Sequence, residues 1–145
     1  MTTQKAPAVI VVDDDPAVRD SLRILLQAYG IYVRDYGSAL KFLADYDTSE
    51  PGCLILDLDM PAMSGIELMA LLRDRGAPIR VIVLTGRSNV RMPGDLPVAT
   101  ILAKPADMDR LLEAINRILA SAASVASVSN ASDGQACAIE RSFAQ

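Results

Sequence analysis

The chain contains no histidine among its 145 residues. Serine and cysteine nucleophiles of hydrolases work with a histidine base, so this absence excludes Ser-His-Asp and Cys-His catalysis. Zinc also loses its commonest ligand. We therefore expect any metal ion bound by this chain to be held by oxygen atoms.

Cysteine is scarce, with Cys53 and Cys137 the only two. They lie far apart in the sequence and do not have the close spacing of a metal-binding cysteine pair. In a reducing compartment we do not expect them to form a disulfide.

Long apolar runs and basic runs are missing as well. The first apolar stretch ends at Asp13 after five residues, which is too short for a signal peptide or a membrane span. We therefore expect a cytoplasmic protein without membrane contact. The formal net charge is −4 and no stretch is rich in Lys and Arg. The sequence therefore lacks the basic surface that contacts phosphates, and we do not expect direct nucleic-acid binding.

What remains is an alternation of short apolar strands and amphipathic helices. We predict strands at residues 9–12, 31–35, 53–56, 79–84 and 98–103. Helices are predicted between them and at the end of the domain, from Pro16 to Gly30, over 38–46, from Ser64 onward and over Leu111–Leu119. The alternation predicts an α/β fold with a parallel sheet covered by helices on both faces. Ligands of such sheets bind beyond the carboxyl ends of the strands.

Local signals define where the predicted helices begin. Asp15 is suited to cap the first helix, and Ser64 with Glu67 has the spacing of a capping box. The short helix 38–46 is expected to turn two leucines toward the core, Leu40 and Leu43.

The interval between the fourth and fifth strands lacks the pattern of a helix. Residues 86–97 contain Pro93, Gly94 and Pro97, and a proline inside a helix costs about 3 kcal/mol. We predict that the helix between these strands is missing or reduced to a turn.

Polar residues follow four of the predicted strands and should share one edge of the sheet: Asp13, Asp14, Asp15, Asp57, Asp59, Thr85 and Lys104. Each alone has an ordinary interpretation, as a helix cap, a strand end or a solvated lysine. Two carboxylates about 4 Å apart repel by roughly 4 kcal/mol at an effective dielectric constant of about 20, so a cluster needs a cation. An all-oxygen site suits Mg²⁺, and a carboxylate can accept a phosphoryl group.

Four segments carry a resemblance to the receiver domains of bacterial response regulators. They occur in the same order and in the expected strands: Val11–Asp15, Leu56–Gly65, Leu84–Gly86 and Ala103–Pro105. The resemblance covers residues 8 to about 120 and implies a flavodoxin-like fold with strand order 2-1-3-4-5. It also implies a role in a two-component system or phosphorelay.

The resemblance implies a role for each residue of the cluster. Asp57 would take a phosphoryl group from a phosphohistidine of a sensor histidine kinase or a histidine phosphotransfer protein. Asp14, with Asp57 and the backbone carbonyl of Asp59, would bind Mg²⁺ or Mn²⁺, and Asp13 would help directly or through water. Lys104 would contact the phosphoryl oxygens, and its bond to the following proline is usually cis in the family.

The switch region matches the family only in part. Thr85 would move toward the new phosphate, and the small Gly86 would leave room for it. Three residues before the lysine, where receivers usually carry Tyr or Phe, this chain has Ile101. We therefore hypothesise that phosphorylation is read through the ordering of loop 86–97. Asp59 and Arg87 lie at positions that tune phosphate lifetime in the family, although they could also be solvated charges without a specific role.

Two alternatives to an active receiver share parts of this pattern. Asp57 and Asp59 also resemble the nucleophile motif of haloacid-dehalogenase-like phosphatases. In those enzymes the nucleophile strand comes first and an acidic pair last, whereas here the acidic triplet 13–15 comes first. A structural module with an inactive site is disfavoured because every key residue is present. We therefore expect no enzyme activity apart from the chain's own phosphorylation and dephosphorylation.

The last 25 residues change in composition. We divide the chain into a receiver domain, residues 1–120, and an Ala/Ser-rich tail, residues 121–145, too short and too polar for a helix-turn-helix module. We expect a stand-alone receiver that signals through contacts with an unidentified downstream protein. One apolar stripe continues from the last helix into the tail and predicts either a homodimer or a fraying linker: Leu111, Ile115, Ile118, Ala122 and Val125.

Overall fold

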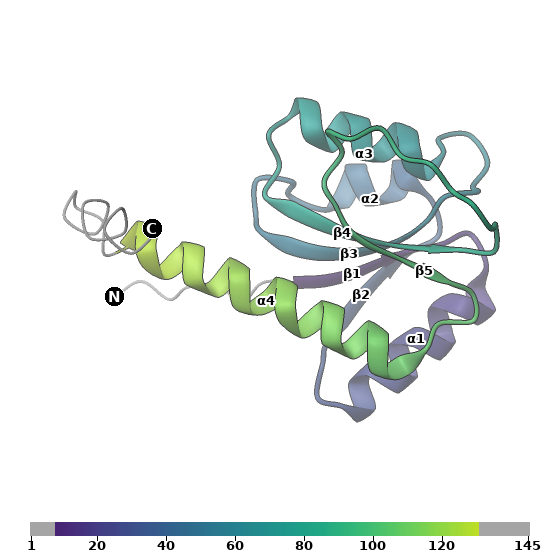
Figure 1. Ribbon diagram of the computed structural model, residues 1–145, viewed down its shortest axis with the longest axis horizontal. Helices are drawn as coiled ribbons and strands as arrows, with labels where there is room; N and C mark the ends of the chain where they lie inside the picture. Colours follow the sequence, from purple (N-terminus) through teal and green to yellow (C-terminus); the bar gives the residue numbers. More distant parts are fainter. Residues whose placement is uncertain (1–7, 131–145) are drawn as a thin grey trace.

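The computed structural model describes residues 8–130, with side chains described as far as residue 122. Five parallel strands form one sheet in the order β2-β1-β3-β4-β5 (Figure 1). The strands are β1 Ala8–Val12, β2 Val33–Tyr36, β3 Gly52–Asp57, β4 Ile79–Thr85 and β5 Val98–Ala103. The predicted doubly wound, flavodoxin-like sheet is confirmed.

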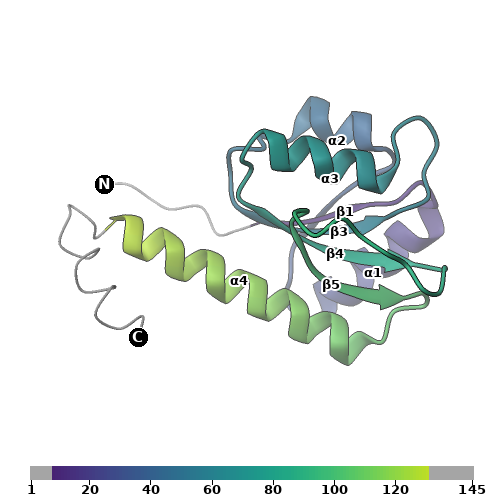
Figure 2. The ribbon, with the colours of Figure 1, turned by 45° about the horizontal axis from the view of Figure 1, so that its top comes forward.

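Helices cover both faces of this sheet. Helices α2 and α3 lie on one face, whereas α1 and α4 lie on the other (Figures 1 and 2). Their bounds are α1 Pro16–Ala28, α2 Ala39–Asp45, α3 Gly65–Asp74 and α4 Met108–Asn130. Within residues 8–130, none of the helices combines the length and the apolar character needed to cross a bilayer.

The three central strands, β1, β3 and β4, are largely apolar because each of their faces meets a helix layer. In β1, Ile10 and Val12 pack in the cluster with α2 and α3, while Val9 and Val11 pack in the cluster with α1 and α4. The central strand β3 is buried along its whole length. These continuous runs are typical of parallel strands covered on both sides.

Cys53 is one of the buried residues of β3, and burial raises the pKa of its thiol to about 12. Cys137 lies outside the described residues. The absence of a disulfide between them stays a prediction.

The helix starts follow the predicted caps. The Asp15 carboxylate accepts a hydrogen bond from the Ala17 N–H at 2.9 Å. At α3, Ser64 and Glu67 each accept from the other's backbone N–H, at 3.2 and 2.8 Å, which is the predicted capping box. A cap of this kind contributes about 1 kcal/mol, so these short helices begin at defined residues.

Strand β2 begins two residues later than predicted, at Val33 instead of 31. Gly30 has a φ of +80°, and the N–H of Ile31 donates to the carbonyl of Leu26. Residue 31 therefore still belongs to the turn that closes α1. A glycine at this position is the usual way to close a helix, because side chains disfavour positive φ. The pattern of apolar residues alone does not show where this turn ends.

The prediction that Leu40 faces the core was wrong, because 54% of its surface is exposed. Phe42 instead is fully buried and determines which side of α2 faces the sheet. Its ring centroid lies 5.7 Å from that of Tyr36 and 5.3 Å from that of Tyr46. Leu43 is partly buried against the same cluster.

No helix forms between β4 and β5, where all of residues 86–97 are described. The segment is nevertheless fixed to the domain, because Leu96 is buried and Val90 packs against the core cluster. Arg73 of α3 pairs with Asp95 at 2.9 Å. The predicted loss of this helix is confirmed, and an anchored loop replaces it.

Helix α4 continues past residue 120 to Asn130 and projects beyond the sheet (Figure 1). Leu111, Ile115 and Ile118 of the predicted dimer stripe are buried in the domain's own core. A dimer could therefore use only the later part of the stripe, and the Val125 side chain lies outside the described residues. The dimer and the division at residue 120 stay predictions.

Candidate functional site

The polar residues that follow the strands meet at one edge of the sheet. Parallel register pairs Asp57 with Leu84 of β4, and Thr85 with Ala103 of β5. Asp13 directly follows β1, and Lys104 directly follows β5. The carboxyl ends of the central strands therefore carry side chains that are far apart in the sequence.

Three carboxylates form a cluster at this edge. One oxygen from each of Asp13, Asp14 and Asp57 lies within 4.8 Å of the other two. Asp13 and Asp57 are buried, whereas Asp14 is exposed. A small, all-oxygen donor set with one solvent-facing member fits a hard cation such as Mg²⁺ or Mn²⁺, which keeps some of its waters.

Lys104 partly offsets the negative charge of this cluster. Its Nζ donates to Oδ2 of Asp13 at 2.9 Å and lies 3.6 Å from Oδ1 of Asp57. Burial by itself would lower the pKa of Lys104, but the hydrogen bond and charge of Asp13, together with Asp57, raise it. The ammonium is therefore fully charged at neutral pH. The Lys104–Pro105 bond is cis, as the resemblance predicts.

Asp57 is a poorly stabilised carboxylate. Burial raises its pKa, and the charges of Asp13 and Asp14 raise it further. The Asp59 N–H, which donates to Asp57 Oδ1 at 3.2 Å, and Lys104 act in the opposite direction without cancelling the shift. A cation in the cluster would therefore favour the ionised form of Asp57.

Asp59 does not join the carboxylate cluster. Both of its oxygens accept hydrogen bonds from the Arg87 guanidinium, with Nε at 3.1 Å from Oδ2. This hydrogen bonding lowers the pKa of the Asp59 carboxyl and raises that of Arg87. The pair connects the loops after β3 and β4 at the mouth of the site. The metal-binding role of the Asp59 backbone carbonyl stays a prediction.

Thr85 is buried, and its hydroxyl accepts the N–H of Arg87 at 3.0 Å. A Cβ added to Gly86 would meet no atom within 4 Å, so the space beside this residue is open. Ile101, at the position where receivers carry an aromatic ring, is 39% exposed on β5. The described structure thus places Thr85 on β4 and Ile101 on the neighbouring edge strand β5, without an aromatic ring at the second position.

Gly65 supports the site and was not singled out in the sequence. A Cβ there would lie 2.6 Å from the Asp57 carbonyl oxygen and 2.9 Å from Cα of Leu58. Its N–H also donates to the Leu58 carbonyl at 3.0 Å. The start of α3 can lie this close to the end of β3 only because the residue is glycine. The Ser64-Gly65 step at the start of the capping box is the one sequence signal that could have indicated it.

Arg19 is a second residue that sequence reasoning missed. Its Nη1 donates to the backbone carbonyl of Asp13 at 2.7 Å, and its Nε donates to Asp35 at 3.2 Å. A bond across 16 residues leaves no local signal in the sequence.

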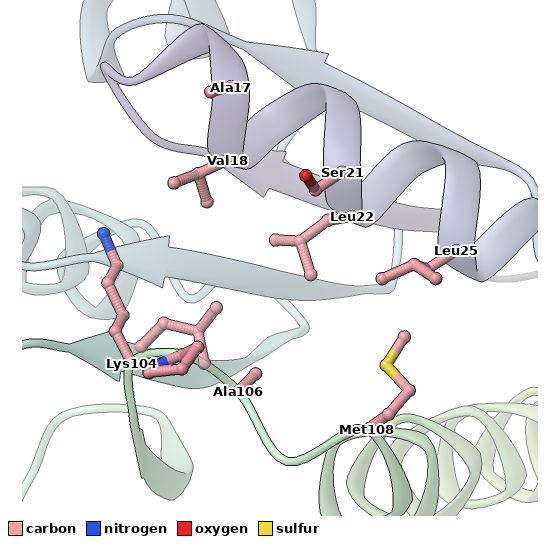
Figure 3. Close-up of a pocket in the computed structure, with 10 residues that line it drawn as sticks. Ala17, Val18, Ser21, Leu22, Leu25, Lys104, Ala106 and Met108 are labelled. Carbon is pink, nitrogen blue, oxygen red and sulfur yellow. The ribbon is translucent and has the colours of Figure 1, made fainter.

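An apolar cavity of about 460 Å³ opens beside the lysine (Figure 3). Val18, Leu22 and Leu25 of α1 face Ala106 and Met108 across it, and Lys104 stands at one end. The carboxylates of Asp13, Asp14 and Asp57 are not among the residues that line this cavity. The chemistry of the site therefore lies with the carboxylates, and the cavity offers mainly an apolar surface.

Comparison with known proteins identifies the family. Residues 9–116 match the response regulator receiver domain. The chain is 39% identical over 118 residues to the transcriptional regulatory protein FixJ of Azorhizobium caulinodans, covering 79% of this chain and 56% of FixJ. The structure of the response regulator StyR is similar, with a TM-score of 0.82 and 34% identity over 89% of this chain and 67% of that one.

A further similar structure is that of the response regulator TrrA of Thermotoga maritima, solved in complex with Mg²⁺-BeF. Its TM-score is 0.65 and its identity 26%, over 77% of this chain and 98% of that one.

The chain belongs to the response regulator receiver domain family, whose members act in two-component signalling. It spans about half the length of the curated relatives FixJ and TodT.

Proposed function

We propose that the chain is a phosphoacceptor receiver and that Asp57 accepts the phosphoryl group. The observation that carries this proposal is the convergence of Asp13, Asp14 and Asp57 within 4.8 Å, with Lys104 beside them, in a member of this family. The chain has no histidine, so the phosphohistidine donor is another protein, a sensor histidine kinase or a histidine phosphotransfer protein.

The proposed cofactor is Mg²⁺ or Mn²⁺, held by the carboxylates of Asp13, Asp14 and Asp57 and by the backbone carbonyl of Asp59. When bound, the ion neutralises charge on the transferring phosphoryl group and offsets the repulsion among the carboxylates. The Mg²⁺-BeF complex of the similar protein TrrA supports this assignment.

In the proposed transfer, a carboxylate oxygen of Asp57 forms a bond to phosphorus while the P–N bond of the donor's phosphohistidine breaks. The products are an aspartyl phosphate and a free imidazole on the donor. The Lys104 ammonium, 3.6 Å from Asp57, would donate to a phosphoryl oxygen. The Thr85 hydroxyl would leave the Arg87 N–H and turn toward the phosphate, in the open space beside Gly86.

The proposed output is a protein–protein contact that depends on phosphorylation. Relatives such as FixJ are transcriptional regulators, but the match covers only 56% of FixJ, so its activity is not carried over to this chain. We propose that a downstream protein recognises the region of loop 86–97 and Ile101. The stand-alone organisation, the homodimer and the cytoplasmic location stay predictions.

The competing function is hydrolysis of phosphomonoesters by Asp57 and Asp59. The bidentate pairing of Asp59 with Arg87 disfavours it, because an acid–base partner of the nucleophile should face the carboxylate cluster. The family match also favours the receiver.

Incubation with acetyl phosphate and Mg²⁺ separates the candidate functions. We expect one phosphoryl group per chain, visible as a single mass increase, and loss of this increase when EDTA removes the metal. Multiple turnover of p-nitrophenyl phosphate with no lasting mass increase would instead support the phosphatase. If the chain shows no mass increase and no turnover, the site is inactive.

A further inference from the structure

Arg19 contacts the acidic cluster through the backbone rather than through a carboxylate. It lies in the first turn of α1, and its Nη1 donates to the carbonyl oxygen of Asp13 at 2.7 Å. Its Nε donates to Oδ2 of Asp35 on β2 at 3.2 Å. The side chains of Arg19 and Asp35 are only 20% and 27% exposed, so this ion pair is less screened than a surface pair. The guanidinium therefore bridges the ends of β1 and β2.

Gly37 leaves room for the guanidinium at the end of β2. A Cβ added to Gly37 would lie 3.1 Å from Nη1 of Arg19 and 3.5 Å from its Cζ. This separation is shorter than ordinary van der Waals contact, so a larger residue would displace the arginine or the chain that follows β2. Glycine leaves the space that the planar group occupies.

The remaining polar groups of Asp13 are anchored as well. Its N–H donates to the Tyr36 carbonyl at 3.2 Å, and its Oδ1 accepts from the Asp15 N–H at 2.9 Å. The bond from the guanidinium completes this set at the carbonyl oxygen. Because a peptide unit is planar, fixing the carbonyl fixes the plane that leads into Asp14. The Cα of Asp14, the exposed member of the cluster, lies in this plane, so the plane limits the directions in which the Asp14 side chain can leave the backbone.

We infer that Arg19 is a positioning residue that sets the affinity of the acidic cluster for a divalent cation. Together with Asp35 and Gly37, it holds the Asp13–Asp14 peptide so that the Asp14 carboxylate converges on those of Asp13 and Asp57. This inference rests on the proposed function in one respect, namely that the cluster binds Mg²⁺ or Mn²⁺.

A positioning role and a purely electrostatic role of Arg19 predict opposite changes in the affinity for a divalent cation when Arg19 is substituted. Arg19 is a cation near the cluster, so removing its charge would by electrostatics alone tighten the binding of a divalent cation. Losing the hydrogen bond to Asp13 instead frees the Asp14 side chain to leave the cluster. Substitutions of groups that orient metal ligands weaken metal binding by about 10- to 100-fold. We therefore expect Arg19→Gln to bind the cation at least about tenfold more weakly.

The test measures the dissociation constant of Mn²⁺ for the full chain by isothermal titration calorimetry, without any phosphodonor. Arg19→Lys keeps the charge but not the planar fork that reaches both Asp13 and Asp35, and Gly37→Ala keeps all charges but crowds the guanidinium. Both are expected to bind Mn²⁺ more weakly than the wild type. Arg23→Gln is the matched control, because Arg23 also lies on α1 but forms only an exposed pair with Asp20.

The outcomes separate the inference from the proposed function. An Mn²⁺ affinity of Arg19→Gln equal to or above that of the wild type overturns the inference, and so does an equal loss in Arg23→Gln. Circular dichroism checks that each variant folds. If Arg19→Gln does not fold, unchanged affinities in Arg19→Lys and Gly37→Ala overturn it. A wild-type chain that binds no Mn²⁺ overturns the proposed function and, with it, this inference.

Discussion

The Lys104 ammonium lies 2.9 Å from the Asp13 carboxylate and 3.6 Å from that of Asp57, although 91 residues separate Lys104 from Asp13. The contact places a permanent positive charge at the position where a phosphoryl group on Asp57 would carry its oxygens. The carboxylates of Asp13 and Asp57 maintain this charge against the opposing effect of burial, and the parallel sheet fixes its position.

Lys104→Met should slow phosphorylation by acetyl phosphate by about 100-fold, the usual cost of removing one donor to a developing negative charge. The matched control is Lys41→Met, which removes an exposed lysine on α2. Time courses of the mass increase measure both rates. Equal rates for the two variants would show that Lys104 has no part in the transfer.

Asp57→Asn should raise the Tm of the metal-free protein. The pKa of Asp57 is raised in the folded state by burial and by its acidic neighbours, so its ionisation costs stability as the pH rises through that pKa. Asparagine does not ionise, so the variant is more stable than the wild type at neutral pH. This difference disappears below the pKa that the Asp57 carboxyl has in the unfolded chain. Asp74→Asn, an exposed residue beside Arg73, is the control and should leave Tm unchanged.

The same Asp57→Asn variant should respond less to Mg²⁺. The ion stabilises the wild type by binding the folded form, and the variant has lost one carboxylate ligand. Thermal unfolding with and without Mg²⁺ measures the difference. An equal rise in Tm for both proteins would place the ion elsewhere.

Gly65→Ala should destabilise the fold by about 1–3 kcal/mol, the usual cost of overpacking. The added Cβ would lie 2.6 Å from the carbonyl oxygen of Asp57, so the end of β3 or the start of α3 must move. Gly94→Ala is the control, because a Cβ there meets nothing within 4 Å. Urea unfolding measures both free energies, and equal values would contradict the close approach seen in the structure.

Phosphorylation should change the amide hydrogen exchange of loop 86–97, beginning at Arg87. In the unphosphorylated chain, the Arg87 N–H is held by the Thr85 hydroxyl, and Asp95 is held by Arg73 at the other end of the loop. Movement of the hydroxyl toward a phosphate releases the first of these contacts. Helix α1 is the internal reference. Identical exchange of the loop in both states would end the hypothesis that the loop reports phosphorylation.

The strand order and the main site residues could be predicted from the sequence because their signals are local. Apolar runs mark the strands, and the carboxyl ends of parallel strands must share one edge, which brought Asp13, Asp57, Thr85 and Lys104 together. The absence of a helix between β4 and β5 was predictable too, because Pro93 has no backbone N–H to donate and so disfavours a helix at its own position.

The remaining features depend on contacts between distant parts of the chain. Leu40 faces solvent because the aromatic packing of Phe42 with Tyr36 and Tyr46 determines the rotation of α2. Arg19 bonds both to the carbonyl of Asp13 and to Asp35, 16 residues away, and Gly65 is required by its close contact with the end of β3. Periodicity and capping rules do not describe such contacts.

The most direct test of the central claim is the location of the phosphoryl group. The wild type and Asp57→Asn are incubated with acetyl phosphate and Mg²⁺, and peptide mass spectrometry then locates the modification. We expect one phosphoryl group on Asp57 in the wild type and none in the variant. Equal phosphorylation of both proteins, or a phosphoryl group on another residue of the wild type, would contradict it.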